Sequence, residues 1–156
     1  MKKLAALLLV LAAACHAAPP TPGSVQPAGA PLAGGGSVGG AASPRAAVSG
    51  FLAAVHAEDL QALASVWGTA AGPARNTIPR DELEKRELIM MCFLRHDRYR
   101  LTSDAESTGG QRRIEVEVSL QDLTRTTSFI TVPGAGGRWY VQSFDMEAVR
   151  DICAKK

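Results

Sequence analysis

Arg113-Ile114-Glu115-Val116-Glu117-Val118-Ser119-Leu120 is the stretch that decides the fold of this chain. Its even-numbered residues are all apolar, and its odd-numbered residues are all polar or charged. A period of two is typical of a β-strand that buries one face and exposes the other. The stretch therefore predicts one strand of a sheet with a single buried face.

Similar strands are expected on both sides of residues 113–120. Before it, Gly109-Gly110 predicts a turn, and residues 98–103 alternate in the same way. After it, a strand is expected over residues 124–132 and another over Arg138 to Phe144, with Pro133 to Gly137 as the hairpin loop. The sequence thus predicts four consecutive antiparallel strands.

Upstream of these strands the apolar period changes to that of helices. Ser43-Pro44 favours a helix start, with Ser as the N-cap and Pro in the first turn. Asp59 is placed to cap a second helix, which Gly68 would end. A third helix is expected from near Pro79 to Arg95, and its core face should include the following residues: Leu83, Ile89 or Met90, Phe93 and Leu94.

A short last helix is expected over residues 146–153, with Val149 and Ile152 on its inner side. Residues 70–76 are expected to form a loop. Helices segregated from an antiparallel sheet make an α+β domain. We therefore expect three N-terminal helices packed on a four-stranded antiparallel sheet, followed by a short C-terminal helix.

Several stretches of this domain resemble the nuclear transport factor two-like (cystatin-like) superfamily. They are residues 43–55, Glu58 to Leu63, Val66-Trp67 and the ending Gly137-Arg138-Trp139-Tyr140-Val141. The resemblance covers most of residues 43–153 and is closest to small bacterial lipoproteins of unknown function. It implies that the sheet is strongly curved and forms a cone around a helix.

The first fifteen residues have the layout of a bacterial lipoprotein signal. Lys2 and Lys3 precede the apolar run Leu4 to Leu11, and small residues lead to Cys15. A membrane-spanning helix needs roughly 20 apolar residues, about twice this run. Lipoprotein processing would cut before Cys15 and acylate it; plain secretion would use the Ala12-x-Ala14 pattern. Ala12 occupies a position where lipoproteins usually have Leu.

The signal sets the expected domain organisation and location. We expect a signal peptide over residues 1–14, a flexible linker over residues 15–42 and the α+β domain over residues 43–156. The linker is almost entirely Ala, Gly, Pro and Ser, a composition that cannot bury enough surface to offset its ordering entropy. His16 stands where an inner-membrane lipoprotein would have Asp, so the family resemblance favours the outer membrane, facing the periplasm.

The charge balance argues against nucleic-acid binding. The chain has 17 Lys and Arg against 15 Asp and Glu, and removal of Lys2 and Lys3 with the signal leaves equal numbers. Nucleic-acid binders normally cluster their basic residues, whereas acidic residues interleave with the arginines of this chain. We expect no nucleic-acid partner.

The three cysteines divide into one lipidation site and one pair. With Cys15 acylated, Cys92 and Cys153 remain as an even number in an oxidising compartment, which favours a disulfide between them. Two buried free thiols are the alternative. Zinc is not favoured, because there is no second cysteine pair and the histidines are scattered. We expect no metal and no cofactor.

Two kinds of site are conceivable in the domain. Enzymes of the resembled superfamily place Asp, Tyr or His inside the cone, and the candidates here are His96, Asp97, Tyr99, Tyr140 and Asp145. Each also suits a cap, a turn or an ordinary strand position, and His56 suits a turn between helices, so we expect no catalysis. A small apolar cavity could instead be lined by these residues: Trp67, Met91, Tyr99, Phe129, Trp139 and Tyr140. The same side chains could fill the core.

The sequence therefore predicts a lipid-anchored envelope protein with a non-enzymatic binding or scaffolding role. Its partner would be another protein or a small apolar ligand, besides the membrane that holds Cys15. One alternative is an isomerase-, dehydratase- or cyclase-like enzyme that uses the region of His96, Asp97 and Tyr99. Another is a structural subunit that forms a homodimer through its outer sheet face.

Overall fold

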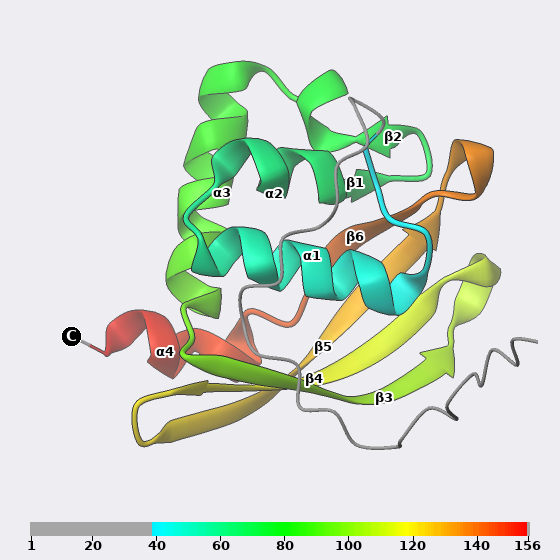
Figure 1. Cartoon of the computed structure of the whole chain (residues 1–156). Helices are drawn as coiled ribbons and strands as arrows, with labels where there is room; N and C mark the ends of the chain where they lie inside the picture. The colour runs from blue at the N-terminus through cyan, green and yellow to red at the C-terminus, as the bar shows by residue number, and fades with distance from the viewer. Residues whose placement is uncertain (1–38, 156) are drawn as a thin grey trace, which may run out of the picture.

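The computed structural model describes residues 39–155. The expected signal peptide, Cys15 and the linker up to residue 38 lie outside the described residues. Within them the chain has an α+β fold, with a four-stranded antiparallel sheet and several helices (Figure 1). The α+β class and the four-stranded antiparallel sheet expected from the sequence are confirmed.

The first two helices begin where their caps predict. Helix α1 spans Pro44–His56, and Ser43 Oγ accepts a hydrogen bond from the Ala46 amide at 3.2 Å. Helix α2 spans Leu60–Val66, and Asp59 Oδ1 accepts from the Ala62 amide at 3.0 Å. Each cap pairs one of the amides that the first turn of a helix leaves without an internal partner.

Helix α3 spans Arg80–Leu94 and buries Leu83, Glu87, Met90 and Leu94. Their spacing of four, three and four residues follows one side of a helix. Of the two alternatives for the core position, Met90 is buried, whereas Ile89 is 52% exposed. Phe93 is only partly buried.

The sheet has the order β3-β4-β5-β6. Its strands are β3 (Arg98–Glu106), β4 (Arg112–Leu120), β5 (Leu123–Pro133) and β6 (Trp139–Phe144). Strand β4 pairs on both sides, and Ile114, Val116 and Val118 are fully buried, as the period of two predicts. Helix α1 lies across one face of the sheet, whose strands curve beneath it (Figure 1).

The connections contain short elements that the sequence did not predict. Strands β1 (Gly68–Thr69) and β2 (Gly72–Pro73) form a separate two-stranded sheet, and the 3-10 turn η1 follows at Ala74–Asn76. Two further 3-10 turns, η2 (Thr108–Gly110) and η3 (Ala135–Gly137), connect strands. The expected last helix is divided into η4 (Glu147–Val149) and α4 (Arg150–Ala154), because Val149 has non-helical backbone angles.

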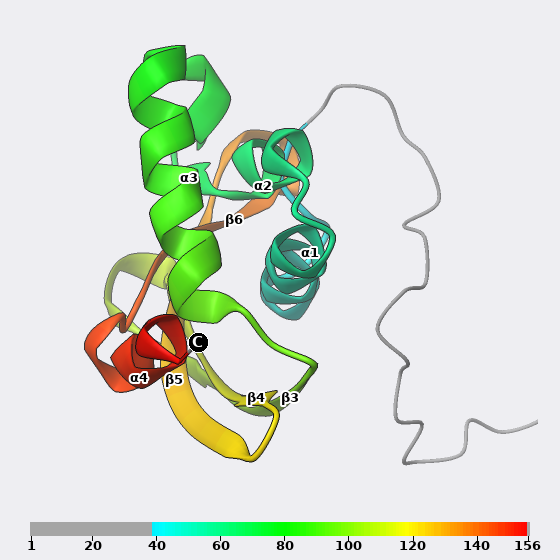
Figure 2. The ribbon, with the colours of Figure 1, turned by 90° about the vertical axis from the view of Figure 1, so that its left-hand side faces the viewer.

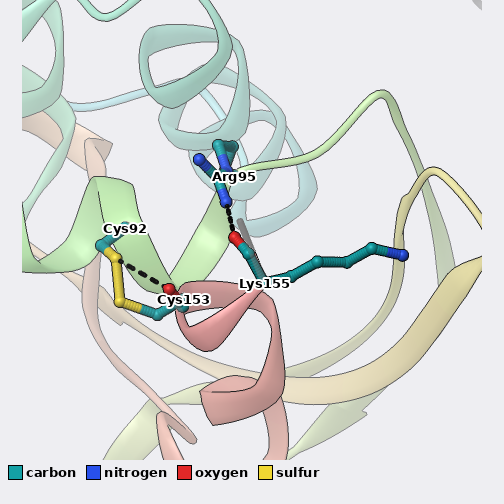
Figure 3. Close-up of a disulfide and its surroundings, with 4 residues drawn as sticks. All are labelled: Cys92, Arg95, Cys153 and Lys155. Atoms are coloured by element: carbon teal, nitrogen blue, oxygen red, sulfur yellow. Dashed lines mark hydrogen bonds between the residues drawn. A yellow bond between two sulfur atoms is a disulfide. The ribbon is translucent and has the colours of Figure 1, made fainter.

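The C-terminal helix is attached to the domain at several points. Cys92 of α3 and Cys153 of α4 lie at disulfide distance, with their Cα atoms 4.8 Å apart (Figure 3). Arg95 Nη2 donates to the backbone oxygen of Lys155 at 2.5 Å. Arg125 Nη2 lies 2.7 Å from Asp151 Oδ2. The first two contacts hold α4 against the end of α3, as Figure 2 also shows, and the third attaches α4 to β5.

Three residues that composition assigns to the linker, Gly39, Gly40 and Ala41, are bonded to the domain. Ala41 pairs with Trp139 through two backbone hydrogen bonds of 2.8 Å. The Gly40 amide donates to Ser65 O at 2.7 Å, and Tyr140 Oη donates to Gly39 O at 3.2 Å. We call residues 39–41 the N-terminal clamp segment. Its contacts show that the folded domain includes residues before Ser43.

Candidate functional site

An apolar cavity of the described residues lies between α3 and β6. We call it the α3–β6 groove; it opens to solvent and has a volume of about 290 Å³. Ten residues line it: Phe51, Trp67, Arg86, Ile89, Met90, Val141, Gln142, Ser143, Phe144 and Met146. They come from α1, the end of α2, α3, β6 and the residues that follow β6. The groove is therefore a product of tertiary packing.

The α3 wall arises from an excess of apolar residues on one helix. Leu88-Ile89-Met90-Met91 is a run of four, but successive helical residues point about 100° apart. Only Met90 of the four is fully inside, so Leu88 and Ile89 remain half exposed. Ile89 lines the groove beside Met90. The run thus provides an apolar wall that reaches solvent.

The β6 wall contains a β-bulge. Thr131 pairs with Val141 and Ile130 with Ser143, which leaves Gln142 as an extra residue on β6. A bulge turns side chains away from the regular alternation. The indole Nε1 of Trp67 donates to the Gln142 backbone oxygen at 3.3 Å. This bond fixes the Trp67 ring at the side of the groove.

Three phenylalanine rings pack together at the inner end of the groove, where Phe51 and Phe144 line it and Phe129 lies behind them. The Phe51 ring lies edge-on to Phe129 and Phe144, at centroid distances of 5.9 and 6.4 Å. Phe129 stacks on Phe144 at 5.6 Å. Phe51 and Phe129 are fully buried. Edge-on and offset aromatic contacts favour particular geometries, so these contacts stabilise the arrangement of the rings at this end of the groove.

Polar groups of the groove lie along its rim. Arg86 is the only charged residue among the ten, and its Nε donates to Glu82 Oε1 at 2.8 Å on the same helix. The Arg86 and Glu82 side chains are 52% and 45% exposed. An exposed i,i+4 ion pair of this kind is weak. Gln142 Oε1 accepts from Gln111 Nε2 at 3.2 Å.

Of the six residues expected to line a cavity, Trp67 lines the groove. Phe129 lies in the core behind it, and Met91 is partly buried against the core. Tyr140 is buried and bonded to the clamp segment. Tyr99 lies at the start of β3, edge-on to His96 at 5.5 Å. The structure thus places these residues in separate surroundings.

Trp139, the sixth, borders a second and more polar depression. Its other lining residues are Glu106, Ser107, Gly110, Gln111 and Arg112. Arg112 Nη2 lies 2.8 Å from Asp104 Oδ1, and its Nη1 lies 3.5 Å from Glu106 Oε1. The Arg112 guanidinium therefore already pairs with two carboxylates of this depression.

Three of the catalytic candidates gather where α3 joins β3. His96 is 4% exposed; its Nδ1 donates to Leu94 O at 2.7 Å, and its Nε2 is buried without a hydrogen-bond partner. Burial lowers the pKa of His96, and the neighbouring His56 lowers it further. Asp97 Oδ2 accepts from the Gln121 amide at 2.6 Å. His56 Nδ1 donates to His96 O at 3.1 Å.

The other two candidates also have bonds within the fold. Tyr140 Oη donates to Gly39 O, and Asp145 Oδ1 accepts from the Ala148 amide at 3.2 Å ahead of α4. No candidate named from the sequence as catalytic lines the α3–β6 groove. The cluster at His96 and the groove are therefore distinct features.

Sequence reasoning missed a buried carboxyl group, Glu87. Its side chain is 2% exposed, and Oε1 has no hydrogen-bond partner. Burial, together with the charge of Glu84, raises the pKa of Glu87 to about 7. Its position four residues after Leu83 and three before Met90 is the signal that could have placed it on the buried side.

Among residues 39–155, no group of three His, Cys, Asp or Glu side chains is arranged to hold a metal ion. In the same range, no helix has both the length and the hydropathy needed to cross a membrane.

Comparison with protein-family models, with curated proteins and with solved structures finds no match for this chain.

Proposed function

We propose that this protein is an exported lipoprotein, acylated at Cys15, whose domain binds an apolar group in the α3–β6 groove. The bound group would be a small apolar ligand or a side chain of a protein partner. On this proposal the acyl chains hold the protein on the outer membrane, facing the periplasm, and the residues before the domain serve as the tether.

The observation that carries the binding proposal is the continuity of the groove's apolar lining. It runs from the buried ring of Phe51 to the half-exposed side chains of Ile89 and Met146. Exposed apolar surface that leads into a concave cavity is typical of binding sites. Methionines at both walls, Met90 and Met146, favour adaptable contacts because their side chains are flexible and polarizable.

Binding is favoured over catalysis by the chemistry of the lining. The ten residues include one guanidinium, one amide and one hydroxyl, and no carboxylate or imidazole that could transfer a proton. An enzyme of the isomerase or dehydratase kind would need such a group within reach of its substrate. The groove supplies shape and apolar surface instead.

We also infer that the domain belongs to the nuclear transport factor two-like superfamily. The order of three helices, four antiparallel strands and a terminal helix within residues 39–155 supports this inference. So does the position of α1 across the curved sheet, which corresponds to the helix inside a cone (Figure 1).

Tryptophan fluorescence tests binding in the groove, because the chain has two tryptophans and only Trp67 lines it. Trp139→Phe leaves Trp67 as the single reporter. Titration with 1-dodecanol should change its emission saturably. Trp67→Phe is the matched control, since Trp139 borders the other depression. This control should not respond. If the emission of Trp139→Phe also stays unchanged, the groove does not bind this apolar ligand.

Fractionation of cells tests the anchor. Cys15→Ala removes the acylation site and should move the protein from the membrane fraction to the soluble fraction. An unchanged distribution would show that Cys15 does not attach the protein to the membrane. Native mass spectrometry of the protein taken from the envelope would report a retained ligand or a protein partner directly.

A further inference from the structure

We propose that the α3–β6 groove is selective for a single-chain amphiphile with an anionic head, such as a free fatty acid, and that Arg86 binds the head. This inference rests on the proposed function, because it assigns the chemical class of the ligand for the same groove. It follows from the separation of apolar and charged groups along the lining.

The apolar part of the groove suits a short hydrocarbon tail. Seven of the ten lining residues are aliphatic, aromatic or methionine side chains, and the inner end is closed by aromatic rings. A volume of about 290 Å³ is at the lower end of the range for ligand pockets. One narrow tail fits this space better than the paired tails of a bilayer lipid.

The head group is indicated by the only charge on the lining. Arg86 carries five N–H donors, and its one bond within the described residues uses Nε. Its two terminal nitrogens are therefore able to meet an anion, and a guanidinium binds a carboxylate through two parallel bonds. A tail that points toward Phe51 leaves its head at the rim, where Arg86 lies.

The carboxylates near the rim are already engaged. Glu82 accepts from Arg86, Asp145 caps the Ala148 amide, and Glu147 Oε1 lies 2.5 Å from Arg150 Nη1. Among these, Glu82 competes directly with a ligand for Arg86. Because the pair is exposed, an anionic head can replace it at low cost.

The test compares three ligands with the same tail and different heads. They are dodecanoate, 1-dodecanol and dodecyltrimethylammonium, each added below the concentration at which it forms micelles, at pH 8. The protein is the full chain with Cys15→Ala and Trp139→Phe, so that no detergent is needed and Trp67 reports binding. We expect dodecanoate to bind about tenfold more tightly than 1-dodecanol, and the cation to bind most weakly.

Variants on α3 separate the role of Arg86 from that of the groove. Arg86→Gln should lower the affinity for dodecanoate about tenfold and leave the affinity for 1-dodecanol unchanged. Arg86→Lys should keep part of the preference for dodecanoate. Glu82→Gln frees Arg86 and should tighten dodecanoate about twofold, which is what loss of an exposed i,i+4 pair supplies. Lys85→Ala removes a neighbouring charge that does not line the groove, and should change nothing.

The outcomes distinguish this inference from the proposed function. Equal affinity for dodecanoate and 1-dodecanol would overturn the assignment of Arg86 and leave apolar binding intact. Binding of neither ligand would overturn both. The same protein, which carries no acyl chain, can also be sedimented with anionic phospholipid vesicles. If it sediments with them and Arg86→Gln abolishes this, the groove recognises a bilayer surface, and the assignment of a free amphiphile is overturned.

Discussion

Cys92, in the last turn of α3, and Cys153, in α4, lie at disulfide distance although they are 61 positions apart in the chain (Figure 3). The whole sheet lies between them in sequence. A bond at this place joins the two ends of the domain's second half. It also holds α4 where Arg125 pairs with Asp151.

We predict that this pair is oxidised in the exported protein and stabilises it. Mass spectrometry without reductant should find the peptides of Cys92 and Cys153 joined. In the chain-entropy model, a closed loop of this length contributes about 4 kcal/mol to the free energy of unfolding. The double variant Cys92→Ser, Cys153→Ser should therefore unfold at lower urea concentration than the parent chain. Two alkylatable thiols in protein taken from the envelope would contradict the prediction.

The buried carboxyl of Glu87 should make stability depend on pH. Its pKa is raised from 4.5 to about 7, so the folded state holds the proton more tightly than the unfolded state does. The resulting stabilisation is complete below about pH 4.5 and is lost as the pH rises to about 7. At pH 8 the folded protein carries a buried, partly unsatisfied carboxylate.

Glu87→Gln should remove this dependence. A shift of this size corresponds to roughly 3 kcal/mol, so the variant should be more stable than the parent at pH 8 by up to that amount. Urea unfolding at pH 5 and at pH 8 measures the effect. Glu84→Gln removes only the smaller of the two causes of the raised pKa, so it should reduce the pH dependence slightly and not abolish it. Equal pH profiles for the parent and Glu87→Gln would refute the prediction.

His96 should have the opposite effect at acid pH. Burial lowers its pKa below 6.5, so the unfolded state binds the proton more tightly. The stabilisation from a neutral His96 is present above about pH 6.5 and is lost as the pH falls through the pKa of the folded state. Proton NMR of the ring should show His96 titrating below the usual range of a histidine. His56→Gln should raise the pKa of His96, because it removes a neighbouring ring whose charge lowers it. No change would refute this contribution of His56.

Those parts of the fold that depend on neighbouring residues in the sequence can be predicted from it. The alternation around Val116 predicts which face of strand β4 is buried, and the caps Ser43 and Asp59 predict where two helices begin. Strands β1 and β2 have two residues each, too few to have a period. The division of the last helix depends on the backbone of Val149, which no cap or proline marks.

The groove is harder to predict, because the residues that line its walls are far apart in the sequence. Trp67 was expected at a cavity, but Ile89 and Met146 were not, since exposed apolar residues carry no sign of what they face. The bulge at Gln142 arises from the pairing of β6 with β5, so the sequence of β6 alone does not predict it. Glu87 is buried by its helical phase, against the usual preference of a carboxyl group.

The clamp segment gives the last prediction, which concerns Gly40 and Tyr140. Gly40 has φ of +78°, and a Cβ atom there would lie 2.8 Å from Cζ of the Tyr140 ring. Tyr140 is buried and cannot move without disturbing its bond to Gly39. Gly40→Ala therefore combines backbone strain with a steric clash. We expect it to lower the free energy of unfolding by about 2–4 kcal/mol.

Gly136→Ala is the matched control for the clash. Gly136 has a similar φ of +67°, but a Cβ atom there meets nothing within 4 Å. It should cost about 1 kcal/mol from strain alone. Urea unfolding of both variants measures the difference, which isolates the contact with Tyr140. If the two substitutions cost the same, residues 39–41 do not pack against the domain in solution, and the ordered domain begins at Ser43.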